Sequence, residues 1–218
     1  NGNRTKFKSK RAIKRFKDDL KKMDSIDEKL SVEKYFTSGY DYTVSKDENN
    51  ITGYIEGYYG KLLSWENRKL IINSLKKNNM NTYFYAPKED VYHRFNWRKK
   101  YDLNWRKNFR DFTQFSKGNN INVIAGISPG LDFDFKTLNH KTKNQESIDY
   151  TILYNKSKQL LDDGASSIAL LLDDIPEDFK NKFGDQISEG TSHGILANML
   201  SQSLGKNIFF VPRIYADE

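Results

Sequence analysis

Two adjacent aspartates, Asp173 and Asp174, directly follow the apolar run Ile168–Leu172. Five consecutive apolar residues are typical of a strand buried on both faces, as in a parallel sheet covered by helices. Charge is costly to bury unless it is paired or used, and active sites of α/β folds lie at the carboxyl ends of strands. The two carboxylates are therefore candidates for acid–base chemistry. The alternative is that they cap the next helix.

Glycoside hydrolysis is the common reaction that uses a carboxylate pair most directly. Successive side chains on an ideal strand point to opposite faces, so both carboxylates reach one ligand only if the chain turns as it leaves the sheet. Most glycosidases draw their acid and nucleophile from different elements. Neighbouring carboxylates instead fit substrate-assisted hydrolysis, in which the acetamido group of the substrate is the nucleophile.

Two further aspartate pairs serve as a comparison within the chain. Asp162-Asp163 precedes Gly164 at the end of a helical pattern, which predicts a solvated helix terminus with glycine as the C-cap. Asp18-Asp19 lies in a lysine-rich amphipathic stretch, and we predict that it is solvated as well.

The elements that must position the candidate pair form an alternating pattern. Strands are expected at Ile51–Tyr59, Asn81–Ala86, Asn122–Ile127, Ser167–Leu172 and Asn207–Val211, and helices at about 64–78, 104–118, 146–162 and 191–204. Such alternation predicts a parallel sheet with right-handed crossovers. Polar or Gly/Pro-rich clusters follow every strand, so one rim of the sheet would gather them around one ligand. Five strands fit either an open doubly wound sheet or the first part of an eight-stranded barrel.

Composition narrows the possible functions. The 218 residues carry a net charge of +7, and they include no cysteine and no apolar run long enough for a transmembrane helix. The basic stretch Arg4–Lys22 is interpreted as a solvated helix or linker, with binding of a polyanion as the alternative. No signal peptide is visible, and the first residue is not Met, as expected of a processed or excised chain.

Several other site types are disfavoured by motif. Gly126–Gly130 matches the G-x-S-x-G nucleophile elbow, but the residue after Ser128 is Pro129, which lacks the N–H that an oxyanion hole needs. No Walker A or dinucleotide-binding loop is present. The histidines His93, His140 and His193 show no metal-ligand spacing, so neither a metal nor a cofactor is expected.

Six segments together resemble the catalytic domain of glycoside hydrolase family 84, which includes O-GlcNAcases and bacterial β-N-acetylglucosaminidases, some of them named hyaluronidases. They occur in order between about Ile51 and Tyr215: Gly53–Gly60, Asn81–Asp90, Tyr92–Arg94, Trp97-Arg98, Ile127–Asp132 and Leu171–Ile175. The resemblance implies a TIM barrel, of which residues 51–218 would supply about the first five βα units. Residues 1–50 are then a basic helical appendage or the tail of a preceding domain.

The resemblance also implies roles for single residues in a retaining, substrate-assisted mechanism. Asp173 would accept a hydrogen bond from the acetamido N–H, and Asp174 would protonate the glycosidic oxygen. Lys88 would contact sugar hydroxyls, the backbone of Gly57 would approach the sugar, and Tyr215 would lie near the acetamido pocket. The chain departs from the family pattern at two places, which read Lys61-Leu62-Leu63-Ser64-Trp65 and Pro212-Arg213-Ile214-Tyr215.

The implied function is removal of terminal β-linked N-acetylglucosamine from a glycoprotein or glycan, without nucleic acid or a cofactor. The alternative is an inactive partial barrel that binds a sugar or glycoprotein. The resemblance favours a secreted or cell-surface bacterial protein, although the sequence itself leaves the location open.

Overall fold

The computed structural model describes residues 50–138, 147–175 and 188–213. The chain divides into two units, Asn1–Asn50 and Ile51–Glu218. The stretch Arg4–Lys22 and the residues His140 and Tyr215 lie outside the described residues, so the interpretations placed on them stay predictions. No helix among the described residues is long and apolar enough to cross a membrane.

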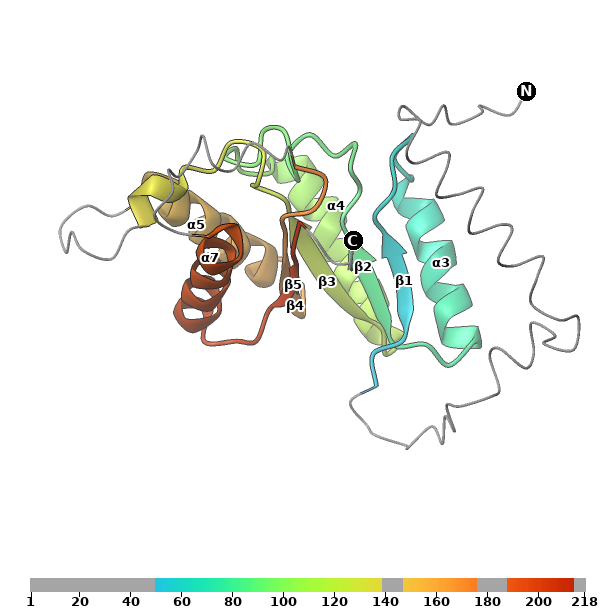
Figure 1. Ribbon diagram of the computed structural model, residues 1–218. Helices are drawn as coiled ribbons and strands as arrows, with labels where there is room; N and C mark the ends of the chain where they lie inside the picture. The colour runs from blue at the N-terminus through green and yellow to red at the C-terminus, as the bar shows by residue number, and fades with distance from the viewer. Residues whose placement is uncertain (1–49, 139–146, 176–187, 214–218) are drawn as a thin grey trace, which may run out of the picture. The chain divides into compact units, whose positions relative to one another are not determined.

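Five parallel strands form one sheet in the order β1-β2-β3-β4-β5 (Figure 1). The strands are β1 (Gly53–Glu56), β2 (Thr82–Tyr85), β3 (Asn122–Ile127), β4 (Ser167–Leu171) and β5 (Phe209–Val211). The helices are α3 (Trp65–Lys77), α4 (Leu103–Gly118), α5 (Ile148–Asp162) and α7 (Glu189–Leu204), and a short 3-10 helix, η1, spans Phe135–Leu138. The alternation predicted from the sequence is confirmed. The expected first strand is too long, because pairing with β2 ends at Glu56↔Tyr85.

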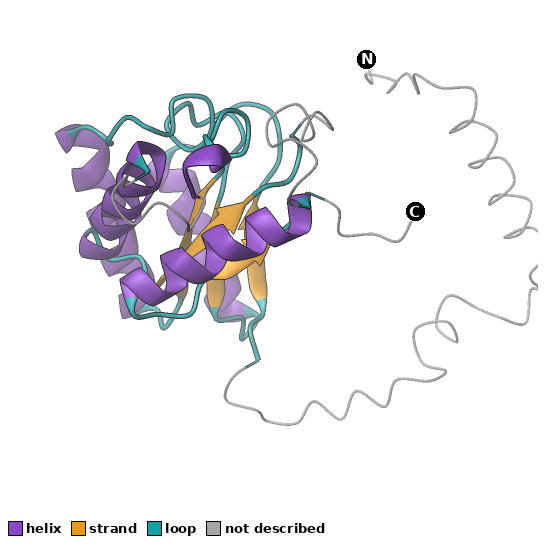
Figure 2. Cartoon of the chain, turned by 60° about the vertical axis from the view of Figure 1, so that its left-hand side comes forward, coloured by secondary structure: helices purple, strands orange, loops and turns teal. Residues whose placement is uncertain are grey.

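The strand order decides between the two folds that the sequence left open. A doubly wound sheet reverses its strand order, whereas here each strand pairs with the next one along the chain. Right-handed crossovers between successive parallel neighbours place all helices on the same face. The sheet is therefore a half-barrel, the first part of a (β/α) barrel. The loops that follow its strands gather at one end of the sheet (Figure 2).

Alternating strand residues serve two separate cores. The outer face of the sheet packs against the helices. The core between them includes the strand residues Tyr83, Tyr85, Val123, Ile127, Ile168 and Leu170 and the helix residues Phe109, Phe112, Leu153 and Leu196. The inner face forms a small cluster of Phe84, Ala86, Ile124, Ala169 and Leu171. Ile55 pairs with Phe84 in register and is 64% exposed, because five strands enclose only part of a barrel.

The prediction of a solvated helix terminus at Asp162-Asp163 is wrong for its second residue. Asp162 is exposed, but Asp163 is only 2% exposed. Its carboxylate accepts two hydrogen bonds from Arg106, at 2.6 and 2.9 Å, and one from Arg110, at 2.7 Å. Because the two arginines are four residues apart on α4, they lie on one face of that helix and reach the end of α5 together.

Candidate active site

The carboxylates of Asp173 and Asp174 both face the ammonium group of Lys88. Lys88 Nζ lies 2.6 Å from Asp173 Oδ2 and 3.3 Å from Asp174 Oδ2. A turn in the backbone makes this possible, because Asp174 has a φ of 54°, in the left-handed region. The sheet therefore ends in the turn that the sequence argument required for two adjacent residues to reach one ligand.

Lys88 comes from the loop that follows β2, and it is only 2% exposed. Its backbone N–H donates to the carbonyl oxygen of Tyr58 at 3.4 Å, which joins this loop to the loop after β1. Gly57 lies in that neighbouring loop. A Cβ added at Gly57 would meet, among the described residues, only the side chain of Ile55. Apart from this contact with Ile55, the described residues leave space for a side chain at Gly57.

Among the described contacts, one carboxylate oxygen of Asp173 accepts a hydrogen bond and the other does not. Its Oδ2 accepts the hydrogen bond from Lys88, whereas Oδ1 is buried and has no partner among the residues that the structure describes. A buried acceptor without a donor is uncommon, because the group loses its hydration without compensation. Among the described residues, this buried oxygen therefore has an acceptor capacity that no donor fills.

Asp174 has more donors around it. Tyr59 Oη donates to its Oδ2 at 3.0 Å, and Arg94 Nη2 donates to its backbone carbonyl at 2.6 Å. Burial pushes the pKa of Asp174 upward, but the hydrogen bond from Tyr59 and the hydrogen bond and charge of Lys88, aided by the charge of Arg94, outweigh it. The pKa therefore lies below its ordinary value. Without a ligand, Asp174 is held as a carboxylate.

Sequence reasoning assigned no role to Tyr59 or Arg94. Both lie in the segments that carry the family resemblance, Gly53–Gly60 and Tyr92–Arg94, and both follow strands that end at the site. The strand-end rule that found Asp173 could have found Tyr59. Nothing in the sequence shows that Arg94 reaches a carbonyl 80 positions away in the chain.

Two acids in the segments Gly53–Gly60 and Asn81–Asp90 have other contacts. Glu56 is fully buried and makes two hydrogen bonds with Arg68, at 2.9 and 2.8 Å. Asp90 accepts hydrogen bonds from the hydroxyls of Tyr85 and Tyr101, at 2.6 and 3.0 Å. These acids hold the walls of the site together and do not face Lys88 in any described contact.

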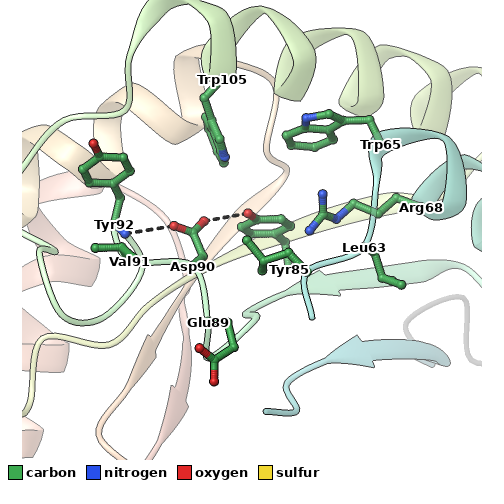
Figure 3. A pocket seen from close by; sticks show the side chains of 10 residues that line it. Leu63, Trp65, Arg68, Tyr85, Glu89, Asp90, Val91, Tyr92 and Trp105 are labelled. Carbon is green, nitrogen blue, oxygen red and sulfur yellow. Dashed lines mark hydrogen bonds between the residues drawn. The ribbon is translucent and has the colours of Figure 1, made fainter. Parts of the chain in front are cut away.

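Asp90 belongs to the wall of a pocket of about 320 Å³. Figure 3 shows it between Tyr85 and the backbone of Tyr92, with hydrogen bonds to both. The pocket is lined by Leu62, Leu63, Trp65, Arg68, Tyr85, Glu89, Asp90, Val91, Tyr92 and Trp105. It includes none of Lys88, Asp173 and Asp174. The pocket lies beside the loop that carries Lys88. The hydroxyl of Tyr85, one of its aromatic lining residues, donates to Asp90 in that loop.

The loop after β2 is fixed by a second buried cation, Lys156 of α5. Lys156 is 1% exposed, and its ammonium donates to the backbone carbonyls of Tyr92, Trp97 and Lys99. Burial lowers the pKa of Lys156 to about 7, although Asp90 opposes the shift. Three carbonyl acceptors match the three donors of an ammonium group, so this lysine ties residues 92–99 to α5.

The remaining candidates do not assemble a second site. Ser128 of the G-x-S-x-G match is fully buried. His93 Nδ1 lies 2.8 Å from the carbonyl oxygen of Gly126, and burial lowers the pKa of His93 to about 4. Among the described residues, no group of three or more His, Cys, Asp and Glu residues could hold a metal ion.

Comparison with known proteins relates this geometry to one family. Residues 52–218 match a family model described as beta-N-acetylglucosaminidase. The protein O-GlcNAcases of Rattus norvegicus and Mus musculus are each 36% identical to the chain over 125 residues, which make up 57% of this chain and 13% of each relative.

Two solved structures are similar to the half-barrel. A mutant of the O-GlcNAc hydrolase of Thermobaculum terrenum matches with a TM-score of 0.65 and 26% identity, over 78% of this chain and 36% of that chain. The protein CpGH84B matches with a TM-score of 0.60 and 30% identity, over 72% of this chain and 25% of that chain. The chain thus matches about a third of the length of the Thermobaculum terrenum protein. It matches a smaller share of CpGH84B and of the two mammalian O-GlcNAcases.

Proposed function

This chain belongs to the β-N-acetylglucosaminidase family, and on that basis we propose that it removes terminal β-linked N-acetylglucosamine from a glycoprotein or glycan. The proposed mechanism is retaining and substrate-assisted, with the acetamido oxygen of the substrate as the nucleophile. Because the chain spans only part of the length of its relatives, the activity is proposed for the natural protein that contains this sequence.

The observation that carries the proposal is the state of Asp173. Lys88 holds Oδ2 at 2.6 Å, and the buried Oδ1 has no donor among the described residues. An acetamido N–H is a donor of the kind this oxygen lacks. A carboxylate fixed there would orient the acetamido group and stabilise the positive charge that develops as the acetamido oxygen attacks the anomeric carbon.

Asp174 would then act as the general acid and afterwards as the general base. Its pKa is held below the ordinary value by Tyr59, Lys88 and Arg94 when no ligand is bound, so substrate must raise it. We expect sugar hydroxyls to draw Lys88 away from Asp174, while the ionised Asp173 beside it disfavours a second negative charge. One carboxyl then stays ionised while its neighbour carries the proton.

The substrate-binding roles of Gly57, Lys88 and Tyr215 complete the proposal. Lys88 would bind ring hydroxyls, and the sugar would approach the backbone at Gly57, where an added Cβ would meet only Ile55 among the described residues. Tyr215 lies outside the described residues and is proposed on the resemblance alone.

The test is hydrolysis of an aryl β-N-acetylglucosaminide by the natural protein and by its Asp174→Asn variant. Asparagine has nearly the same shape and tolerates the left-handed backbone, so the change removes mainly the proton donor. The expected loss is about 10²–10⁴-fold in kcat. Asp162→Asn, an exposed carboxylate, is the matched control with unchanged activity. An unchanged rate for Asp174→Asn, or an inverted product anomer by NMR, would contradict the mechanism.

A sugar-binding module without turnover is the second candidate, because the described strands enclose only part of a barrel and leave Ile55 exposed on its inner face. Calorimetric binding of N-acetylglucosamine, abolished by Asp173→Asn, with no hydrolysis by the natural protein, would support this candidate over the first.

A further inference from the structure

We propose that Arg94 is a positioning residue, which holds the backbone turn that brings Asp173 and Asp174 together on Lys88. This inference rests on the proposed function, because the turn matters for catalysis only if Asp174 is the general acid. Arg94 need not touch the substrate. It acts through the carbonyl group and the carboxylate of Asp174.

The turn is a strained feature that requires support. A non-glycine residue with φ near 54° adopts a sparsely populated conformation, which costs on the order of 1–2 kcal/mol, although aspartate tolerates it better than most residues. In an extended conformation, Asp174 would point to the opposite face from Asp173. Lys88 could then no longer contact both carboxylates.

Arg94 supplies that support from two directions. Its Nη2 donates to the carbonyl oxygen of Asp174 at 2.6 Å, and its Nη1 donates to the hydroxyl of Tyr59 at 3.0 Å. Tyr59 in turn donates to Asp174 Oδ2 at 3.0 Å. The three residues form a closed ring that fixes the backbone and the side chain of Asp174 at once. The planar fork of arginine permits this, whereas the point charge of lysine does not.

The surroundings of Arg94 argue against a role in stability alone. It is 6% exposed, yet no carboxylate lies within ion-pair distance among the described residues, and its buried Nε has no partner there. The described contacts of its guanidinium are the hydrogen bonds to Asp174 and Tyr59 and the faces of the Tyr59 and Phe95 rings, and a buried charge held without an ion pair is costly. A buried charge without an ion-pair partner among the described residues, beside candidate catalytic groups, is typical of a functional site.

The loop that carries Arg94 is itself held in place. Lys156 donates to the carbonyls of Trp97 and Lys99 on one side of Arg94, at 2.9 and 2.7 Å. Asp90 accepts from the backbone N–H of Tyr92 at 2.9 Å on the other side. Arg94 therefore extends from a fixed loop, so the position of its guanidinium is well defined.

The experiment compares wild type, Arg94→Met and Arg94→Lys on two aryl β-N-acetylglucosaminides, one with an activated dinitrophenyl leaving group and one with an unactivated alkylphenyl group. A misplaced general acid slows departure of the poor leaving group most. We expect about a 10–10²-fold loss in kcat for the alkylphenyl substrate in both variants, and little loss for the dinitrophenyl substrate. Equal losses on the two substrates would overturn the proposal.

The pH profile of kcat/KM gives a readout that a purely structural role would not move. The protonated form of Asp174 is the active one, so activity falls as pH rises through its pKa in the free enzyme. Removing the cation in Arg94→Met raises that pKa and shifts the alkaline limb to higher pH. Arg94→Lys keeps the charge and shifts it less. An unmoved limb in Arg94→Met would contradict the inference.

Two controls keep the test decisive. Arg106→Met removes an arginine that pairs with Asp163, and it should leave both readouts unchanged. If Arg94→Met fails to fold, Tyr59→Phe and Arg94→Lys are compared alone and combined. Residues of one hydrogen-bonded ring have non-additive effects on kcat, so additive losses would contradict the ring.

Titration of the Asp174 carboxyl by 13C NMR separates this inference from the proposed function. An inactive wild type would refute the function. The inference about the turn would stand if Arg94→Met raised the Asp174 pKa and would fall if it did not.

Discussion

The aspartate pairs at the end of α5 and at the end of β4 differ in the balance of their partners. At the end of α5, the single carboxylate of Asp163 accepts from two guanidinium groups, those of Arg106 and Arg110. At the end of β4, the two carboxylates of Asp173 and Asp174 share one ammonium group, that of Lys88. The first site has a surplus of donors, and the second has a surplus of acceptors.

This difference separates a structural ion pair from a candidate ligand-binding site. The Asp163 side chain is 1% exposed and fully engaged. The side chains of Asp173 and Asp174 are 14% and 43% exposed, and one buried oxygen of Asp173 has no donor among the described residues. A carboxylate surrounded by donors contributes to stability, whereas one left short of donors among the described residues keeps an acceptor that a ligand can use.

The largest expected effect is on the structural pair. Asp163→Asn should lower the free energy of unfolding by about 2–4 kcal/mol, because it leaves two arginines without their shared carboxylate and loses charge-assisted hydrogen bonds. Asp162→Asn, next to it and exposed, should change stability by no more than about 0.5 kcal/mol. Urea denaturation of both variants measures the difference. Equal effects at the two positions would show that the arginine contacts contribute nothing.

Much of the fold was predictable, because alternating strand and helix patterns follow from apolar spacing. Strand β3 matches its expected bounds, and helix α5 lies within the range of about 146–162 expected for it. The choice between a barrel and an open sheet was not predictable from spacing, since both folds share the same alternation. Strand order decided it.

The site was predictable only as a set of residue types at strand ends. That rule located Asp173 and Asp174, and the family resemblance added Lys88. The left-handed turn at Asp174 and its contact with Arg94 depend on three-dimensional packing, which a single sequence does not show. The burial of Asp163 was missed for the same reason, because α4 supplies its partners from 53 and 57 positions away.

A smaller effect on the free energy of unfolding is expected when Asp173 and Asp174, at the end of β4, lose the cation that they share. Lys88→Met leaves two neighbouring carboxylates without the ammonium group between them, so we expect a loss of about 1–2 kcal/mol at neutral pH from like-charge repulsion. The pKa of Asp174 should rise, because Lys88 is one of the groups that lower it. The deficit should therefore shrink as pH falls and Asp174 becomes protonated. A deficit that is constant between pH 7 and pH 4 would indicate lost packing instead.

The smallest effect is on the pH dependence of stability through Asp174 itself. Its pKa in the folded protein lies below the ordinary value of 3.8, so the ionised form stabilises the fold above the pKa of the unfolded chain. That contribution is lost as pH falls through the folded-state pKa. Because the side chain is 43% exposed, water screens the interaction and only a few tenths of a kcal/mol are expected. Asp174→Asn should therefore be less sensitive to acid than wild type below about pH 4 in urea denaturation, and Asp162→Asn should not. If the two variants lose stability in parallel, Tyr59, Lys88 and Arg94 do not hold Asp174 as a carboxylate, and the contrast between the two aspartate pairs reduces to burial alone.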